Sequence, residues 1–473
     1  FRYDLGSMGR DYLGKGKNEA VLNETAALWG VDAKSEMYKL PAMYVGEYAE
    51  RDAEITLELW QQMKQEIQHQ DIESIFDLET ELFPCLVDMR FLGVRVDIEA
   101  ANRLKQKLLT EEKECLQKVK KETSIDIQIW AARSIAQVFE KLRLPFDRTE
   151  KTNSPSFTKN FLKNHPHPIV KHIARAREIN KAHTTFIDTI LKHEHKGRIH
   201  AEINQLRSDQ GGTVTGRFSY NNPNLQQIPA RNKELGPMIR SLFIPEEGCQ
   251  WGVFDYSQQE PRLVVHYAAL QNLYGVGDVL DAYQDTDVDF HQIVAEMAEI
   301  PREQAKTINL GLFYGMGKNK LQAELGVSKE KAESLFKQYH SRVPFVKQLM
   351  DNVMQRAQGR GKIRTLLGRL CRFHLWEPNQ FGIHKPLPHD AALAEHGPGI
   401  RRAFTYKALN RLIQGSAADM TKKAMIELHK EGITPHIQVH DELDISVDNN
   451  ADKIKEIMES AVDLEVPNKV DYE

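Results

Sequence analysis

Apolar residues recur at helical spacing through the first part of the chain. Residues 50–70 and 99–122 carry leucine, isoleucine and other apolar residues three or four positions apart, with charged residues between them. This spacing puts the apolar side chains on one helix face and the charged side chains on the other. We therefore expect the first half of the chain to be mainly helical.

Two later segments have the pattern of strands, and each contains an acidic residue. Residues 249–257 form an apolar run that leads directly into Asp255. In residues 433–447, apolar residues at every second position flank a polar centre that contains Asp441. The first segment therefore predicts a buried strand, and the second predicts a pair of strands joined by a turn.

The segments between and before these strands differ in character. Residues 301–316 and 329–343 have helical patterns, so we expect an antiparallel sheet with a large helical excursion between its acid-bearing strands. Residues 211–231 are rich in Gly, Asn and Gln and predict an ordered loop or a linker. Residues 376–400, rich in Pro and Gly, predict an irregular surface insertion.

Length and charge set broad limits. A chain of 473 residues should hold two to four domains. Its 63 basic and 67 acidic residues give a net charge of -4, which is no global sign of a nucleic-acid partner. Charge is uneven, however, because six Lys and Arg residues in 159–181 are opposed by a single acid, Glu178. Any basic surface is therefore expected to be local, although a solvated helix face explains this segment equally well.

Cysteine spacing and hydropathy exclude several classes of protein. The four cysteines lie far apart and form no C-x-x-C pair, which argues against zinc and against a disulfide framework. No run of apolar residues is long enough to span a bilayer, and no export leader is present. We therefore expect a reducing, cytoplasmic setting without a membrane role. Because residue 1 is Phe, we expect the chain to be a piece of a longer protein.

The two strand-borne carboxylates are candidates for metal binding. An ionised carboxylate in apolar surroundings needs compensation, since burying an unpaired charge is costly. Two divalent cations held by Asp255 and Asp441 would provide it and would support an in-line phosphoryl transfer. The alternative is that both are ordinary turn residues.

The helix predicted for 301–316 carries an unusual stripe. Arg302, Lys306, Leu310 and Tyr314 lie four residues apart and therefore follow one face. Two cations, an apolar residue and an aromatic ring suit a nucleotide, with the cations on the triphosphate, Leu310 by the sugar and Tyr314 near the base. An ordinary amphipathic helix is the alternative.

Three motifs of the chain resemble those of a known family. Segments 255–262 (DYSQQEPR), 302–315 and 438–442 (QVHDE), in that order, closely resemble motifs A, B and C of the family A DNA polymerases. Residues 215–229 resemble the primer-template binding segment of that family, and residues 410–419 resemble the helix before its last palm hairpin. The resemblance implies a DNA-directed DNA polymerase, a nucleotidyltransferase that would extend a primer with dNTPs in DNA replication.

The resemblance implies a catalytic centre. Asp255, Asp441 and the backbone carbonyl of Tyr256 would bind two Mg²⁺ ions, with Mn²⁺ as an alternative. Lys306 would be the third catalytic residue and would protonate the leaving pyrophosphate. Glu260 would lie under the sugar and exclude a 2'-OH. The implied nucleotide contacts come from Gln258, Glu260, His291, Arg302, Lys306, Leu310 and Tyr314.

The resemblance also implies contacts with the duplex. Polar side chains would check the minor groove near the primer end without reading sequence, because the acceptors there are common to all base pairs. Basic residues of the thumb would hold the backbone. The implied DNA-binding residues are Arg177, Lys181, Arg217, Asn224, Gln226, Gln227, Asn410, Gln414 and His440.

The fold implied by the resemblance is a right hand of the α/β, more closely α+β, class, with an antiparallel palm sheet and helical fingers and thumb. Tyr48 and Asp52 resemble the third motif of a 3'-5' proofreading exonuclease, whose earlier motifs would lie upstream, and the chain would stop in the last palm strand. The expected division is an exonuclease remnant at 1–75 and a polymerase domain at 76–473, with the thumb at about 95–190, the palm at about 190–265 and 405–473, and the fingers at about 266–404.

Departures from the family pattern carry information. Gln259, Pro261 and Leu310 stand where many relatives carry other residues, which favours a phage enzyme in an infected bacterial cytoplasm over a cellular repair enzyme. A repair polymerase, a single-subunit RNA polymerase and a non-catalytic DNA-binding protein are the alternatives. Glu260 and Glu442 favour DNA synthesis. The sequence leaves open a processivity factor, helicase or primase.

Overall fold

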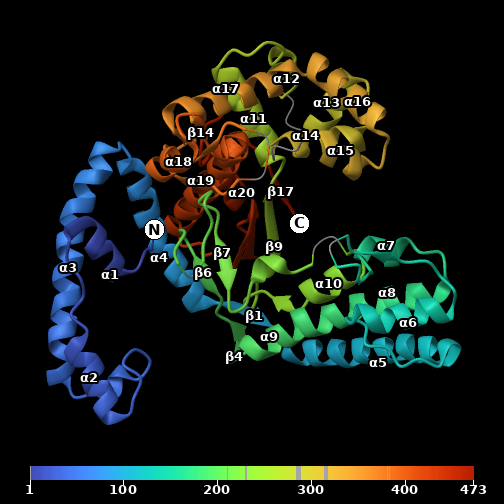
Figure 1. The fold of residues 1–473 in the computed structure, drawn as a ribbon, viewed down its shortest axis with the longest axis horizontal. Helices are drawn as coiled ribbons and strands as arrows, with labels where there is room; N and C mark the ends of the chain where they lie inside the picture. The colour runs from blue at the N-terminus through green and yellow to red at the C-terminus, as the bar shows by residue number, and fades with distance from the viewer. Residues whose placement is uncertain are drawn as a thin grey trace.

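The computed structural model describes residues 2–150, 152–209, 211–229, 232–283, 289–313, 318–380, 382 and 384–473. For residues 310, 312, 313, 318–320 and 324 it describes the backbone alone. Long helices combine with small antiparallel sheets, so the expected mixed α/β class is confirmed. Figure 1 shows a central sheet with one helical body above it, a second at its lower right and a long helical arm at its left.

The central sheet brings the two acid-bearing segments together. Its strand order is β15 (Ile437–Val439), β16 (Glu442–Val447), β9 (Gln250–Tyr256) and β17 (Val470–Tyr472), all antiparallel. The strands predicted for 249–257 and 433–447 are therefore confirmed. The chain also ends in a strand of this sheet, as expected.

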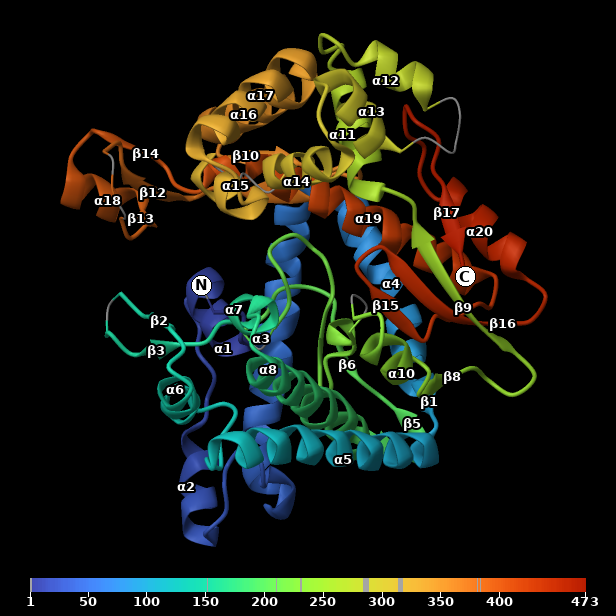
Figure 2. The ribbon, with the colours of Figure 1, turned by 90° about the vertical axis from the view of Figure 1, so that its right-hand side faces the viewer.

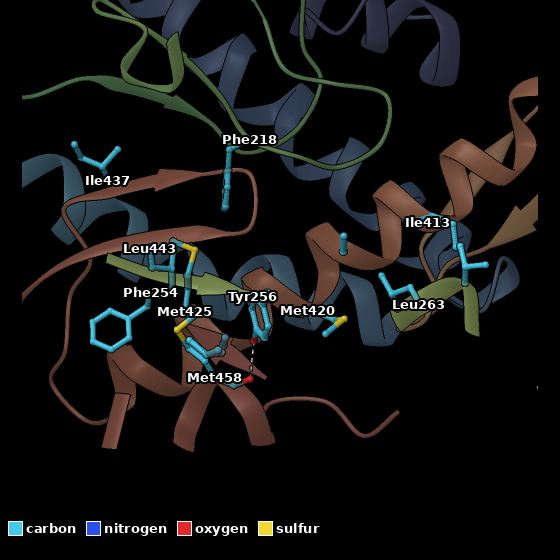
Figure 3. Packing of buried hydrophobic residues seen from close by; sticks show 14 of the residues in the cluster. Phe218, Phe254, Tyr256, Leu263, Ile413, Met420, Met425, Ile437, Leu443 and Met458 are labelled. Carbon is cyan, nitrogen blue, oxygen red and sulfur yellow. Dashed lines mark hydrogen bonds between the residues drawn. The ribbon is translucent and has the colours of Figure 1, made fainter. Parts of the chain in front are cut away.

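One face of this sheet is sealed by helices. Phe254, Leu443 and Ile445 are buried, as expected for alternate positions on two paired strands. Helices α19 (Ala408–Lys430) and α20 (Ala451–Ser460) supply the methionines that pack against them, as Figure 3 shows. The Tyr256 hydroxyl donates to the Met458 carbonyl at 2.6 Å. The end of β9 that carries Asp255 is thus rigidly anchored.

A set of helices fills the chain between β9 and the second half of the sheet. The segments predicted as helical at 301–316 and 329–343 form α14 and α16, although residues 314–316 lie outside the described part. The helices of this body are α11 (Gln259–Leu270), α12 (Gly277–Ala282), α13 (Phe290–Ala298), α14 (Arg302–Phe313), α15 (Lys318–Leu325), α16 (Lys329–Arg342) and α17 (Pro344–Arg360).

The prediction of an irregular insertion at 376–400 was wrong. This segment contributes to a three-stranded sheet, with β12 (Leu375–Pro378) between β13 (Leu387–Pro388) and β14 (Ile400–Arg402), and to α18 (His389–His396). Trp376 packs between the guanidinium of Arg402 at 4.5 Å and the ring of His389 at 4.9 Å. Strands this short, bounded by Pro and Gly, carry too few alternating positions to be recognised in sequence. A hairpin of β10 (Lys362–Arg364) and β11 (Leu370–Arg372) precedes it.

Two long helices form a separate body with its own core. Helices α5 (Ile98–Thr123) and α8 (Pro168–Lys181) lie side by side, and Figure 2 shows them below the central sheet, opposite α14 and α15. Val119, Phe139 and Ile173 are among the buried residues of that core. The elements between and after the two helices are α6 (Ala132–Lys141), the hairpin of β2 (Asp147–Arg148) and β3 (Pro155–Ser156), α7 (Lys159–Asn164), the π-helical segment η3 (Ala182–Ile187) and α9 (Asp188–His193).

The N-terminal arm is joined to the centre by buried ion pairs. Helix α3 (Ala42–His69) extends away from the sheet and turns into α4 (Glu73–Leu92), which packs against α19. Glu79 of α4 pairs with Arg369 at 2.5 Å and with Lys422 of α19 at 2.7 Å, and Arg369 also pairs with Asp419 at 2.7 Å. This network connects the arm, the β10–β11 hairpin and α19. Helices α1 (Leu5–Met8) and α2 (Ala20–Trp29) lie ahead of α3.

The remaining strands form two further antiparallel groups. They form one sheet of β4 (Glu194–His195), β5 (Arg198–Ile199), β1 (Val94–Val96) and β8 (Phe243–Ile244), and a pair of β6 (Glu202–Asn204) and β7 (Ser219–Asn221). The segment 211–231, expected to be a loop or linker, contains β7 and the 3-10 turn η4 (Leu225–Gln227) in its described part, and helix α10 (Leu235–Arg240) follows it. Across the described chain, no helix combines the length and apolar character needed to cross a bilayer.

Candidate active site

Asp255 and Asp441 meet at one edge of the central sheet. Asp255 lies opposite Glu442 in the β9–β16 register, and the backbone N–H of Tyr256 donates to the carbonyl of Asp441 at 3.2 Å. Asp441 occupies the tight turn between β15 and β16, where His440 has a φ of 61°. The two carboxylates, far apart in sequence, are therefore neighbours.

Their electrostatic setting favours a cation. The pKa of Asp255 is raised to about 7. The largest cause is the loss of water around its carboxylate, which is still partly exposed, and the charges of Asp441 and Glu442 follow. Burial likewise raises the pKa of Asp441 to about 6, although Arg217 acts in the opposite direction. Two carboxylates that resist ionisation beside each other, together with the Tyr256 carbonyl, fit a hard divalent cation.

The protein side chains alone do not complete a cation site. Within the described ranges, no three His, Cys, Asp or Glu side chains converge closely enough to hold a metal ion. A cation held by Asp255 and Asp441 would therefore need more oxygen ligands from substrate or water. Such an open site suits catalysis better than structural metal binding.

An ion pair lies next to the two carboxylates. Arg217 donates to Glu260 of α11 at 2.6 Å, and both side chains are largely buried. Both charges act on His440, so the three predicted residues occupy one region. Gln226 also reaches it, donating at 3.3 Å to the backbone carbonyl and to the side chain of Gln438 in β15. Arg217, Gln226 and Glu260, from distant parts of the chain, are thus brought to the β15–β16 hairpin that carries His440 and Asp441.

The predicted triphosphate contacts gather at the start of two helices. Arg302 and Lys306 are exposed on α14, and the buried ring of His291 in α13 lies within reach of both charges. Arg302 is held by Asp289, which accepts from its Nε at 2.7 Å and also from Nη2. Tyr314 and the side chain of Leu310 lie outside the described residues, so their predicted contacts are not tested.

Gln258 links the end of β9 to α13. Its side-chain oxygen accepts from the backbone N–H of Phe290 at 2.8 Å, and its own φ is 54°. The side chain is therefore engaged with the protein in this state. It couples the turn after Asp255 to the helix that carries His291.

A basic groove lies between α8 and the segment that follows η4. Its volume is 610 Å³, and it is lined by the six Lys and Arg residues of the basic segment 159–181 together with Trp130 and Gln227. Lys181 is exposed there. Arg177 is half-buried and donates to the carbonyls of Ile129 at 2.6 Å and Phe157 at 2.8 Å, so part of its binding capacity supports the α5–α8 body itself.

The remaining predicted residues divide between two places. Asn224 caps η4 by accepting from the Gln226 N–H at 3.1 Å, while Asn410 and Gln414 are half-buried, one helical turn apart on α19. Tyr48 and Asp52 lie one turn apart on α3, which precedes all the other predicted site residues in the sequence. Lys17 donates to Asp52 at 2.8 Å and to the Tyr48 hydroxyl at 3.2 Å.

Most of the chain matches one known protein family. The model of DNA polymerase family A matches residues 98–473, which include every catalytic, nucleotide-binding and DNA-binding residue predicted above. The chain belongs to DNA polymerase family A. It is a DNA-directed DNA polymerase, and membership of this family implies metal-dependent catalysis.

Relatives of this polymerase include phage enzymes, which agrees with the expectation from its motifs. It is 34% identical over 525 aligned positions to the DNA-directed DNA polymerase of Pseudomonas phage M6, covering all of this chain and 76% of that protein. It is 29% identical to DNA polymerase DpoZ of Acinetobacter phage SH-Ab 15497, covering all of this chain and 80% of that protein.

A solved structure matches the fold of the polymerase over its whole length. The POL domain of Pol1 from M. smegmatis, in complex with a DNA primer-template and dNTP, superposes with a TM-score of 0.78 and 25% identity, covering 100% of this chain and 78% of that chain. The fold of the polymerase is therefore that of a Pol I polymerase domain. The boundaries expected for thumb, palm and fingers stay predictions.

Several residues that support this region of the polymerase were given no role by the sequence analysis. Asp289, Asn309 and Tyr339 are isolated polar residues whose partners lie on other helices. Arg262 is 2% exposed and donates to the Ser257 carbonyl at 2.9 Å, which holds the turn after Asp255. Only Arg262 offered a hint, because a charge within the apolar run of α11 must find a buried partner.

Proposed function

We propose that this polymerase extends a DNA primer with dNTPs by two-metal-ion phosphoryl transfer in replication. The observation that carries the proposal is the meeting of Asp255 and Asp441 at one sheet edge. A similar polymerase domain, that of Pol1 from M. smegmatis, was solved with primer-template DNA and dNTP. The phage polymerases among the relatives support replication over repair.

Asp255, Asp441 and the carbonyl of Tyr256 would hold two Mg²⁺ ions. When bound, these cations supply Lewis-acid activation and neutralise charge that develops on the phosphoryl oxygens. The protein contributes rigidity, because Tyr256 is fixed at its hydroxyl by Met458 and at its N–H by Asp441. Arg217 offsets part of the negative charge beside Asp441.

The nucleotide would bind between α14 and the end of β9. Arg302, Lys306 and His291 would contact the triphosphate, and Lys306 would donate the proton to the departing pyrophosphate. Glu260, oriented by Arg217 at 2.6 Å, would lie under the sugar and exclude a 2'-OH. Gln258, Leu310 and Tyr314 would complete the pocket.

The duplex would run from the active site into the basic groove. Arg217, Gln226 and His440 lie together at the carboxylates, where the primer end must be. The remaining minor-groove contacts would come from Asn224, Gln227, Asn410 and Gln414, and backbone contacts from Arg177 and Lys181.

The N-terminal arm would belong to a proofreading exonuclease in a longer parent protein. Tyr48 and Asp52 share one face of α3, as the exonuclease motif requires. Lys17 pairs with Asp52, so a cation already occupies this carboxylate. We expect no complete nuclease site in residues 1–75 and a right-hand polymerase in residues 76–473.

Primer extension tests the proposal. A primed template, dNTPs and Mg²⁺ should give templated extension by the chain, and Asp255→Ala should lower the rate by at least about a thousandfold. Asp448→Ala is the matched control, because Asp448 is an exposed carboxylate just past the other end of β16. Efficient extension by Asp255→Ala, or preferential incorporation of NTPs, would contradict the mechanism or the substrate.

A further inference from the structure

Three buried polar side chains form a hydrogen-bonded series that ends at His291, one of the predicted triphosphate contacts. The Tyr339 hydroxyl of α16 donates to Oδ1 of Asn309 in α14 at 2.5 Å. Nδ2 of Asn309 lies 3.0 Å from Nδ1 of His291 in α13. Tyr339 and Asn309 are fully buried, and His291 is 7% exposed. Three neighbouring helices of one body are therefore linked through these side chains.

The donors and acceptors of this series run in one direction. Among the described residues Tyr339 has no other hydrogen-bond acceptor, so its proton must go to Oδ1 of Asn309. The amide nitrogen then faces His291 and donates, which makes Nδ1 of the ring an acceptor. A neutral imidazole that accepts at Nδ1 carries its proton at Nε2.

At the other end of this series, Nε2 of His291 has no described hydrogen-bond partner, and the charges of Arg302 and Lys306 both act on the ring. The backbone N–H of His291 is bonded to Asp289 at 2.8 Å, so the start of α13 is fixed as well. Burial lowers the pKa of His291, so the ring is neutral at pH 7 and its tautomer matters.

A merely structural role does not explain this chemistry. Three polar groups in a core are costly to bury, and apolar side chains of similar size would fill the same space. Both hydrogen bonds run toward the ring of His291, whose second nitrogen, Nε2, has no described partner. The arrangement resembles the outer partners that fix the tautomer of a histidine that binds a ligand.

We propose that Asn309 and Tyr339 are positioning residues that hold His291 with its Nε2 proton directed at the triphosphate of the incoming nucleotide. The proposal rests on the predicted role of His291 in nucleotide binding. It adds a direct requirement: the nucleotide site needs a proton at Nε2, and the Tyr339 hydroxyl determines that it is there.

Two variants of the full chain test the chemistry. Tyr339→Phe removes the donor and lets Asn309 turn, so KM for dNTP should rise about fivefold while kcat stays within about twofold. Asn309→Asp replaces the donor to Nδ1 by an acceptor, which should move the ring proton to Nδ1 and raise KM further. Tyr283→Phe is the matched control, because it removes another buried phenol hydroxyl that takes no part in this hydrogen-bonded series. It should leave KM unchanged.

A second readout separates the tautomer from catalysis. Nitrogen-15 spectra of histidine-labelled protein, with the His291 signal assigned by its loss in His291→Gln, report which ring nitrogen carries the proton. We expect protonation at Nε2 in the wild type and a mixture in Tyr339→Phe. Protonation at Nδ1 in the wild type, or Tyr339→Phe with unchanged tautomer and KM, would overturn the proposal. An unchanged KM in His291→Gln would instead reject the nucleotide contact on which it rests.

Discussion

The carboxylate of Asp255 is poorly suited to a protein without bound cations. Its pKa is raised to about 7, first by loss of water and then by Asp441 and Glu442. A carboxyl with a raised pKa destabilises the fold when ionised. This penalty is absent below the unfolded pKa, about 4, and complete above about 7. Without a cation, the ionised carboxylate of Asp255 therefore lowers the stability of the fold, and a bound cation would remove this cost.

A single substitution should reveal that cost. In EDTA, Asp255→Asn should stabilise the protein at pH 8 by about 1 kcal/mol, after allowance for solvent screening of the exposed carboxylate. The gain should shrink at pH 5. The midpoint of chemical denaturation at the two pH values measures it. An equal gain at both values would show that the ionised charge is not the cause.

The Arg217–Glu260 pair suggests how a sugar is selected. Replacing Glu260 by Ala removes the side chain predicted under the sugar, so discrimination against NTPs should fall by at least about tenfold. Steady-state incorporation of dCTP and CTP opposite the same template base measures the ratio. Unchanged discrimination would mean that another residue excludes the 2'-OH.

At the scale of elements, helix α13 depends on Asp289, the N-cap residue that precedes it. Asp289 caps it by accepting from the N–H groups of His291 and Gln292, and the same side chain holds Arg302. Asp289→Ala should destabilise the start of α13 by about 1 kcal/mol, whereas Asp289→Asn, which can still cap, should cost much less. Hydrogen exchange of α13 measures the difference. Similar exchange in both variants would contradict a capping role.

The elements show what sequence could predict. A short apolar run identified β9, regular alternation identified β15 and β16, and sustained helical spacing identified α3, α5, α14 and α16. The strands of 375–402 were missed because each is too short to show a period. The motifs named Arg217 and Glu260 separately. Their ion pair, like the bond between Gln226 and Gln438, joins residues whose proximity only the fold creates. Isolated polar residues such as Asn309 and Tyr339 carry no pattern at all.

At the scale of the whole molecule, Lys422 is a key residue of the buried network that joins the N-terminal arm to the centre. It is fully buried, burial lowers its pKa to about 8, and it pairs with Glu79. Lys422→Met should cost about 3 kcal/mol because the acid loses a partner. The neighbouring Lys423→Met, which breaks a partly exposed pair with Glu427, should cost less than about 1 kcal/mol. Denaturation midpoints compare the two, and equal costs would contradict the role of burial.

DNA binding should depend on local charge in spite of the negative total. Lys181→Gln should weaken duplex binding to all sequences alike and reduce the slope of log K against log salt by about 0.9. Lys121→Gln, an exposed lysine at the end of α5 outside the groove, is the control. Fluorescence anisotropy over a salt series measures both. Identical slopes for the two variants would remove Lys181 from the duplex track.

The central sheet also constrains how the upper helices can move. Asp255 and Asp441 belong to the sheet and to its β15–β16 turn, whereas Arg302 and Lys306 belong to α14, in the helical body that begins after β9. A rigid-body movement of that helical body relative to the sheet would displace the two cations and leave the two carboxylates in place. Substrate held by α14 could in this way be carried toward carboxylates that do not move.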